Sequence, residues 1–216
     1  ITARFYFSDE KKTRSLQLDY KSINFNTKWI LSGSSSIIYR ETLNSTLSIA
    51  LDKQRQINDK GKVVITDHQT SGKGTHGKQW ISTAYKDLTF SIILGNENSF
   101  GQKLIDECCL AMVHVLSLYD LKANIKYPND IYINNKKIVG ILLSNIQSQG
   151  SENKPYQALS IGMNVNSEID IKSIDEKAKV NSTSIFLELG KEIKREELLK
   201  LIIQNIDPAI QKQGYL

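Results

Sequence analysis

The sequence predicts a single α+β domain in which helices flank a β-sheet. Three observations carry this prediction. Apolar and polar residues alternate over 88–94, which is typical of a strand. Apolar residues recur at helical spacing over 102–119, and strand-like segments then follow one another from 124 to 166 before helical patterns return. Because strands and helices occur in separate runs of the chain, the pattern is that of an α+β fold.

Composition limits the class of protein. The 216 residues can bury one substantial core, and 40% apolar with 24% charged residues is ordinary for a soluble globular domain. The net charge of +5 is modest and the lysines are spread along the chain, which argues against a nucleic-acid partner. No apolar run approaches the ~18 residues of a membrane span, so no membrane partner is expected. Cys108 and Cys109 are neighbours, and since a disulfide between neighbours is strained, free thiols in a reducing, cytoplasmic setting are expected.

The N-terminal third contains a flank, a strand, a helix and a second strand. Residues 1–36 are predicted to be a flank that packs on the domain 37–216, and because the chain begins without Met we expect a fragment or a processed product. A strand is expected near 37–41, and residues 44–46 suit the N-cap of a helix that runs to about residue 57. A short buried strand over 63–66 leads into a glycine-rich loop. The aromatic residues available to dock the flank are Phe5, Tyr6, Phe7, Phe25 and Trp29.

The remaining elements follow in order. Asn134 and Asn135 predict a hairpin turn within the consecutive strands, because Asn tolerates positive φ. A polar loop is expected over 148–155 and a further strand over 158–165. Residues 181–183 are predicted to cap a helix that is closed by Gly190, and a last helix begins at Arg195. Pro208 is expected to interrupt or end that helix.

The glycine-rich loop reads Ser71-Gly-Lys-Gly-Thr-His-Gly-Lys-Gln-Trp80. Its first positions match a P-loop, but Gln79 stands where Mg²⁺ needs Ser or Thr, and a strand pattern follows instead of a helix. A plain surface turn is the simpler alternative. Glycines at alternating spacing together with Lys73 and Lys78 can form a nest of backbone N–H groups with two cations, which favours phosphate binding.

A second block contains a lysine before a rigid turn. It reads Lys126-Tyr-Pro-Asn-Asp130-Ile-Tyr and continues with Lys137-Ile-Val-Gly140-Ile-Leu. Taken alone, Lys126 would be a surface lysine before a turn. The two blocks in this order and spacing resemble the nucleotide loop and catalytic lysine of the biotin–protein ligases (holocarboxylase synthetases). The resemblance extends over about residues 37–205.

That resemblance implies a fold, a reaction and a partner. The fold would be a mixed β-sheet like that of class II synthetases, flanked by helices, as in the catalytic domain of biotin and lipoate ligases. The substrates would be biotin and ATP with Mg²⁺, which give biotinyl-5′-AMP. The biotin would then pass to a lysine of a biotin carboxyl carrier domain of a carboxylase. The C-terminal SH3-like barrel and N-terminal DNA-binding domains of some members are not visible in this chain, and the oligomeric state stays open.

The resemblance also implies site residues. Lys126 would be catalytic, because one ammonium between the biotin carboxylate and the α-phosphate offsets their repulsion. Asp130 would serve Mg²⁺. No His or Cys spacing suggests another metal site. The biotin residues would be Ser45, Thr46, Gln69, Lys73, Gly74, Thr75, Lys126, Gly140 and Gly162, and the nucleotide residues Gly72, Lys73, Gly74, Thr75, Trp80, Asn129 and Asn164.

Two alternatives remain open. A lipoate–protein ligase shares the scaffold and the adenylate chemistry, although it would be expected to lack the Pro-Asn-Asp turn. A non-catalytic biotin or nucleotide sensor would keep the pocket without turnover, and two departures from the family pattern, Leu47 and Thr75, favour it. Mass spectrometry of the acyl-adenylate would separate them.

Overall fold

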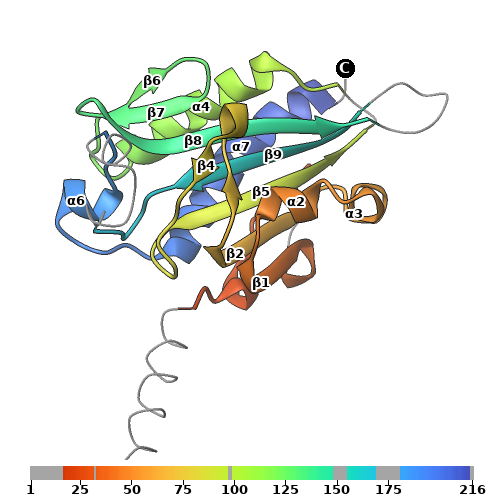
Figure 1. Cartoon of the computed structure of the whole chain (residues 1–216), viewed down its shortest axis with the longest axis horizontal. Helices are drawn as coiled ribbons and strands as arrows, with labels where there is room; N and C mark the ends of the chain where they lie inside the picture. The colour runs from red at the N-terminus through yellow and green to blue at the C-terminus, as the bar shows by residue number, and fades with distance from the viewer. Residues whose placement is uncertain (1–16, 32, 97–98, 148–154, 169–180, 215–216) are drawn as a thin grey trace, which may run out of the picture.

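The domain is built on one seven-stranded mixed sheet, seen in the computed structural model in Figure 1. The structure describes residues 17–31, 33–96, 99–147, 155–168 and 181–214. The sheet order is β1-β2-β5-β9-β8-β7-β6, in which β1 and β2 are parallel and every other neighbouring pair is antiparallel. The predicted α+β class with a mixed sheet is therefore confirmed. The strands are β1 Ile37–Leu43, β2 Val63–Gln69, β5 Leu88–Gly95, β6 Asn124–Lys126, β7 Asp130–Ile133, β8 Lys136–Ile146 and β9 Tyr156–Met163.

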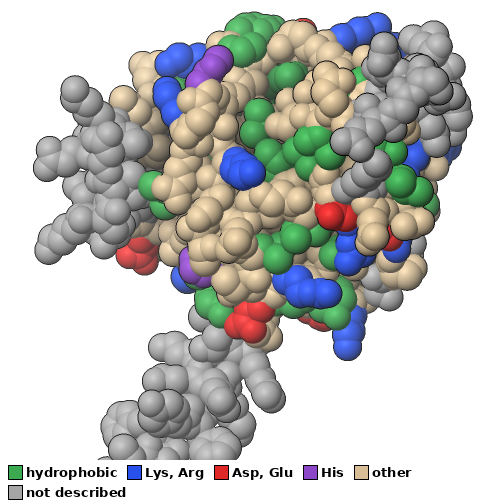
Figure 2. Space-filling view, turned by 45° about the vertical axis from the view of Figure 1, so that its right-hand side comes forward, with side chains coloured by type: hydrophobic (Ala, Val, Ile, Leu, Met, Phe, Trp, Pro, Cys, Tyr) green, Lys and Arg blue, Asp and Glu red, His purple; other side chains and the backbone are tan. Residues whose placement is uncertain are grey.

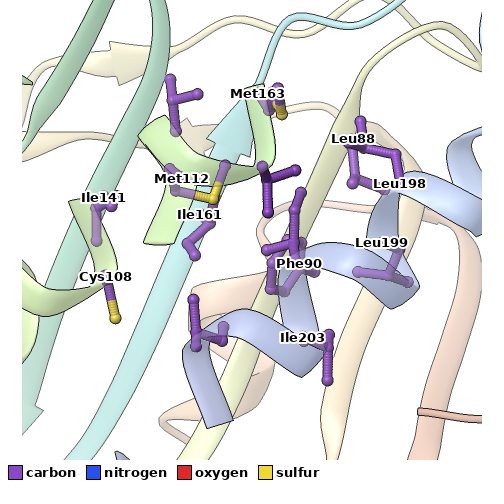
Figure 3. Packing of buried hydrophobic residues seen from close by; sticks show 14 of the residues in the cluster. Leu88, Phe90, Cys108, Met112, Ile141, Ile161, Met163, Leu198, Leu199 and Ile203 are labelled. Atoms are coloured by element: carbon purple, nitrogen blue, oxygen red, sulfur yellow. The ribbon is translucent and has the colours of Figure 1, made fainter. Parts of the chain in front are cut away.

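One face of the sheet is covered by two long helices, α4 (Gln102–Ser117) and α7 (Arg195–Gly214). Large apolar side chains alternate along β5, so that Phe90 and its neighbours point at the helices, and Met112 of α4 and Ile203 of α7 meet them (Figure 3). These side chains are fully buried, and each contributes roughly 1.5–3 kcal/mol of hydrophobic stabilisation relative to exposure. This side of the sheet carries the main core.

The opposite face carries smaller side chains and shorter covering elements. The short helix α2 (Thr46–Ala50) packs there in a second apolar cluster that includes Leu47, Val64 and Ile93. Next to α2, a small hairpin crosses in front of the sheet and consists of β3 (Gly72–Lys73) and β4 (Gln79–Trp80), joined through the turn η3 (Thr75–Gly77) (Figure 1). A hollow remains between this hairpin and the sheet.

The flank is part of the same core in its described portion. Leu18, Ile23, Phe25 and Ile30 are buried in the main cluster, and Trp29 packs against it. The short turns η1 (Tyr20–Ser22) and η2 (Ser34–Ser36) lead to β1. The predicted docking residues Phe5, Tyr6 and Phe7 lie outside the described residues.

The predicted helix over 46–57 is wrong as one helix. It is two, because α2 ends at Ala50 and α3 (Lys53–Asn58) begins anew. Asp52 caps α3 by accepting a hydrogen bond from the backbone N–H of Arg55 at 3.1 Å. An Asp directly after an apolar stretch is a start signal for a helix, so a new helix begins here instead of the old one continuing.

Two further boundaries differ from the prediction at the C-terminal end. Helix α6 (Ile185–Leu189) is capped by Ser184, whose hydroxyl accepts from the N–H of Leu187, and not by residues 181–183, whereas Gly190 closes it in the left-handed conformation as predicted. Pro208 neither ends nor interrupts α7, since the helix runs on to Gly214. Ile206 and Ile210 are fully buried on both sides of the proline, and this packing outweighs the loss of one helical hydrogen bond.

Other local predictions hold. Asn134 and Asn135 have φ values of 49° and 62° and form the turn between β7 and β8. The predicted loop over 148–155 lies almost wholly outside the described residues. None of the described helices is long and apolar enough to cross a membrane. On the face shown in Figure 2, basic and acidic side chains are interspersed.

Candidate functional site

A pocket lies between the β3–β4 hairpin, α2 and the face of the sheet that carries small residues. The empty space amounts to about 450 Å³, part of it open solvent. It is lined by Ser45, Thr46, Leu47, Gln69, Lys73, Gly74, Thr75, Trp80, Thr89, Phe90, Asn129, Lys137, Gly140, Ile141, Leu142, Ser160, Ile161 and Gly162.

Two glycines form the floor of the pocket. Gly140 of β8 and Gly162 of β9 are directly paired across the two strands, and the indole ring of Trp80 lies over both. A Cβ at Gly162 would overlap this ring, and a Cβ at Gly140 would lie 3.0 Å from it. The absence of side chains at these positions therefore lets the hairpin approach the sheet closely.

The hairpin itself is shaped by its glycines and by a tight turn. His76 and Gly77 both have positive φ, at 54° and 73°, and the N–H of Gly74 donates to the carbonyl oxygen of Lys78 at 2.8 Å. A Cβ at Gly72 would overlap the backbone of Trp80. Gly72 thus serves the closure of the hairpin and does not line the pocket.

Two lysines, Lys73 and Lys137, line the pocket. Lys137 Nζ lies 2.6 Å from Asp130 Oδ1 and 5.5 Å from the centroid of the Trp80 ring. Its backbone is fixed on both sides, since its N–H donates to Asn181 at 2.6 Å and its carbonyl accepts from Thr183 at 2.9 Å. One ammonium group is therefore held in a defined position over Gly140.

Uncharged polar groups occupy the end of the pocket near α2. The side-chain oxygen of Gln69 accepts from the backbone N–H of Thr46 at 2.8 Å and from its hydroxyl at 3.2 Å. Ser45 Oγ is buried, and none of the described groups hydrogen-bonds to it. This end can therefore hydrogen-bond a neutral polar group of a ligand, whereas the lysines suit an anion.

Most of the predicted site residues meet in this pocket. The predicted residues that line it are Ser45, Thr46, Gln69, Lys73, Gly74, Thr75, Trp80, Asn129, Gly140 and Gly162. Asn129 is oriented by a hydrogen bond from its side-chain amide to the carbonyl of Ile141 at 2.7 Å.

The structure contradicts the prediction that Lys126 lies in the pocket. Lys126 ends β6, the outermost strand, and its exposed ammonium lies 4.7 Å from the ring centroid of Tyr132. Lys137, on β8, lies two strands closer to the pocket. The lysine that faces the site is therefore Lys137.

Asn164 also lies outside the pocket. It is buried, its side chain donates to the carbonyl of Thr183 at 2.9 Å, and its N–H donates to Ile138 at 3.0 Å. These bonds hold the segment before α6 beside β8. Asn164 thus supports the backbone that positions Lys137.

The fit of a protein-held Mg²⁺ at Asp130 is poor. Its carboxylate is engaged by the Lys137 ammonium. Within the described ranges, no group of three or more His, Cys, Asp or Glu side chains could hold a metal ion. Mg²⁺ prefers several oxygen ligands, so these residues do not form a site for it on their own.

Several lining residues were missed by sequence reasoning, and Lys137 is the most important. Its signal was present in the adjacent aliphatic residues Ile138 and Val139, which are both fully buried and break strand alternation. The register shift between β7 and β8 at this point is a bulge, and a bulge turns neighbouring side chains to a different face. The others missed were Leu47, Thr89, Phe90, Ile141, Leu142, Ser160 and Ile161.

Groups with shifted pKa values lie in the supporting structure. Burial raises the pKa of Asp87, whose carboxylate accepts from the N–H groups of Thr83 at 2.7 Å and Val165 at 2.9 Å. Cys108 and Cys109 are free thiols, and burial raises the pKa of Cys109 to about 11. Neither thiol lines the pocket, so thiolate chemistry plays no part in it.

Comparison with known proteins gives a consistent result. Residues 39–166 match the model of the biotin/lipoate A/B protein ligase family. The bifunctional ligase/repressor BirA of Bacillus spizizenii is 30% identical over 192 residues, which is 87% of this chain and 57% of the relative. The chain thus spans little more than half the length of that relative.

Solved structures share the fold. A biotin protein ligase from Aquifex aeolicus in complex with biotin and ATP has a TM-score of 0.65 and 26% identity, covering 82% of this chain and 70% of the other. A biotin protein ligase from Leishmania major in complex with biotinyl-5-AMP has a TM-score of 0.61 at 23% identity, covering 82% of this chain and 75% of the other, and supports the fold alone.

Proposed function

The chain belongs to the biotin/lipoate A/B protein ligase family, and we propose that it activates biotin with ATP as biotinyl-5′-AMP and transfers the biotin to a lysine of a biotin carboxyl carrier domain. Biotin suits the pocket chemically, because it has a neutral polar head group and a carboxylate at the far end of a short apolar chain. The similar structure from Aquifex aeolicus, named as a biotin protein ligase in complex with biotin and ATP, supports this choice.

One observation carries the proposal. The pocket has uncharged hydrogen-bonding groups at the end formed by Thr46 and Gln69, and two ammonium groups, those of Lys73 and Lys137, elsewhere in its wall. The indole ring of Trp80, which rests on Gly140 and Gly162, adds an apolar wall to the pocket. A ligand with a polar head, an apolar body and an anionic tail matches this order.

In the first step a biotin carboxylate oxygen attacks the α-phosphorus of ATP. A phosphorus–oxygen bond to biotin forms, the bond to the β-phosphate bridging oxygen breaks, and pyrophosphate leaves with the electron pair. Two anions must approach for this reaction, and the Lys137 ammonium offsets their repulsion and stabilises the charge in the transition state. Lys73 and the N–H groups of the hairpin would bind the phosphates.

In the second step the neutral ε-amine of the carrier lysine attacks the biotinyl carbonyl carbon. An amide forms, AMP leaves, and the amine releases one proton. Asp130 has a positioning role, since its ion pair with Lys137 holds the ammonium beside the pocket. Mg²⁺ would enter as part of the substrate MgATP, since the Asp130 carboxylate is engaged by the Lys137 ammonium.

The setting and partner of the reaction follow from its chemistry. The partner is the carrier domain of a carboxylase, whose lysine must reach the open side of the pocket. We place the reaction in the cytoplasm, where two adjacent free thiols such as Cys108 and Cys109 stay reduced.

The test is to incubate the purified chain with MgATP and either biotin or lipoate, and to follow pyrophosphate release and acyl-adenylate by mass spectrometry. We expect biotinyl-5′-AMP, and biotinylation of an added carrier domain. Lipoyl-adenylate without biotinyl-adenylate would favour the lipoate ligase. Biotin binding without pyrophosphate release would favour a sensor that does not turn over.

A further inference from the structure

A row of hydroxyl groups crosses the floor of the pocket and ends at Gln69. Ser160 Oγ lies 2.7 Å from Ser91 Oγ, which lies 2.9 Å from Thr46 Oγ1, and that hydroxyl lies 3.2 Å from Gln69 Oε1. Ser91 of β5 and Ser160 of β9 are directly paired, so their side chains share the pocket side of the sheet. Ser91 is fully buried and does not line the pocket, so it acts on a ligand only through its neighbours.

The protons in this row can point in one direction only. The backbone N–H of Thr46 donates to Gln69 at 2.8 Å, so the amide oxygen, and not the amide nitrogen, faces Thr46. The Thr46 hydroxyl donates to the same oxygen, and since a hydroxyl has one proton, it can only accept from Ser91. Ser91 has then used its own proton, so Ser160 must donate to Ser91.

This direction determines what the pocket offers a ligand. The oxygen of Gln69 is occupied, so its NH₂ group, a donor, remains for the ligand. Ser160 has committed its proton to Ser91, so its lone pairs, acceptors, face the pocket. Both residues line the pocket, one on each side of the row. A head group that fits must combine an acceptor and a donor.

We propose that Ser91 is a positioning residue that fixes Ser160 as an acceptor, so that, together with the Gln69 donor held by Thr46, the pocket selects a cyclic urea as the ligand head group. The urea carbonyl oxygen accepts from Gln69, and a urea N–H donates to Ser160. This deepens the proposed biotin-activating function and rests on it. A cyclic guanidinium presents donors only and mismatches Gln69, and a dithiolane ring lacks both N–H and carbonyl groups.

The test compares biotin with 2-iminobiotin, in which a protonated nitrogen replaces the urea oxygen, in pyrophosphate release at saturating MgATP. Ser91→Ala removes the central hydroxyl. Ser144→Ala is the matched control, because Ser144 is on the neighbouring strand β8 and outside the pocket lining. Ser91→Thr restores a hydroxyl, and Ser160→Ala removes the first hydroxyl of the row at a partly exposed position that tolerates truncation more readily.

We expect Ser91→Ala to raise the KM for biotin about 2- to 12-fold, the range for one net neutral hydrogen bond. The kcat and the KM for ATP should stay within about twofold, because a head-group contact is the same in ground and transition states. The KM for 2-iminobiotin should rise by a similar factor, because its ring N–H also donates to Ser160, whereas Gln69, held by Thr46, still discriminates against it. Ser160→Ala should behave alike, and Ser91→Thr should stay close to wild type. These KM values do not depend on the fraction of folded protein.

The proposal is overturned if Ser91→Ala and Ser160→Ala keep the biotin KM of Ser144→Ala. It is also overturned if they lower kcat while the biotin KM is unchanged, since that result indicates a structural role. Failure of the wild type to release pyrophosphate with biotin contradicts the proposed function instead.

Discussion

Lys126 and Lys137 belong to the same run of strands, yet their surroundings differ. Lys126 is exposed at the edge of the sheet, and Lys137 lies at the pocket beside Asp130. We predict that Lys137→Met, which removes the charge and keeps the length, lowers the rate of pyrophosphate release at least about 100-fold, the usual cost of one preorganised group in a transition state. Stopped-time assays of pyrophosphate measure this rate.

Lys126→Met is the matched control, and its rate of pyrophosphate release should stay within about threefold of wild type. An exposed lysine outside the pocket is screened by solvent and contributes little to charge stabilisation in the site. If Lys126→Met lowered the rate of pyrophosphate release more than Lys137→Met, the catalytic lysine would be Lys126. Thermal unfolding of both variants separates a catalytic loss from a folding loss.

At the scale of residues, the sequence did not predict which of these two lysines lies at the pocket. The resemblance to the biotin–protein ligases predicted most of the pocket, including Gln69, Trp80 and the floor glycines. It missed Lys137 because one bulge changes which side chain faces the site, and the position of a bulge depends on pairing between strands. Ser160 was missed because an isolated serine in a strand has no distinctive pattern.

At the scale of elements, the β3–β4 hairpin depends on the glycine floor. We predict that Gly162→Ala lowers the free energy of unfolding by about 1–3 kcal/mol, the cost of overpacking, and raises the KM for biotin, because the added methyl displaces the Trp80 ring. Urea denaturation and initial rates measure the two effects.

Gly101→Ala serves as the control for this change. A Cβ at Gly101 meets no atom within 4 Å, and its φ of −138° is open to alanine. Its biotin KM should equal that of wild type. If Gly162→Ala left both stability and KM unchanged, the hairpin would not rest on the sheet as described.

Elements were predicted well where burial and periodicity agree, as in β5 and α4. The sequence did not predict the split between α2 and α3, nor the continuation of α7 through Pro208. Both depend on competition between local signals and tertiary packing. Sequence periodicity does not give the packing energy that keeps a helix intact across a proline.

At the scale of the whole molecule, a buried ion pair and its hydrogen bonds join four segments of the chain. Asp67 of β2 lies 2.7 Å from Arg195 at the start of α7, and it accepts hydrogen bonds from Tyr39 of β1 at 2.6 Å and from the N–H of Leu18 in the flank at 3.2 Å. Asp67→Asn removes the carboxylate charge from this pair, whereas Arg195 keeps its hydrogen bond to the carbonyl of Asp87 at 3.2 Å. We predict a loss of about 3–5 kcal/mol in the free energy of unfolding, measured by urea denaturation.

The exposed pair Lys194–Glu197, at 3.2 Å, provides the comparison. Glu197→Gln should change the free energy of unfolding by less than about 1 kcal/mol, because solvent screens exposed charges. Equal effects of the two substitutions would show that the buried pair does not hold the flank, β2 and α7 together.

The unequal faces of the sheet also bear on how such a protein can diversify. Alternate residues of β8 and β9 point to opposite sides, so Gly140, Ser160 and Gly162 line the pocket while Val139, Leu159 and Met163 lie in the main core. A lineage can therefore alter the depth and polarity of the binding side without disturbing the packing that keeps the domain folded. The helix-covered side of the sheet can stay constant for stability while the pocket side changes. This division gives one scaffold a physical route to ligands as different as biotin and lipoate.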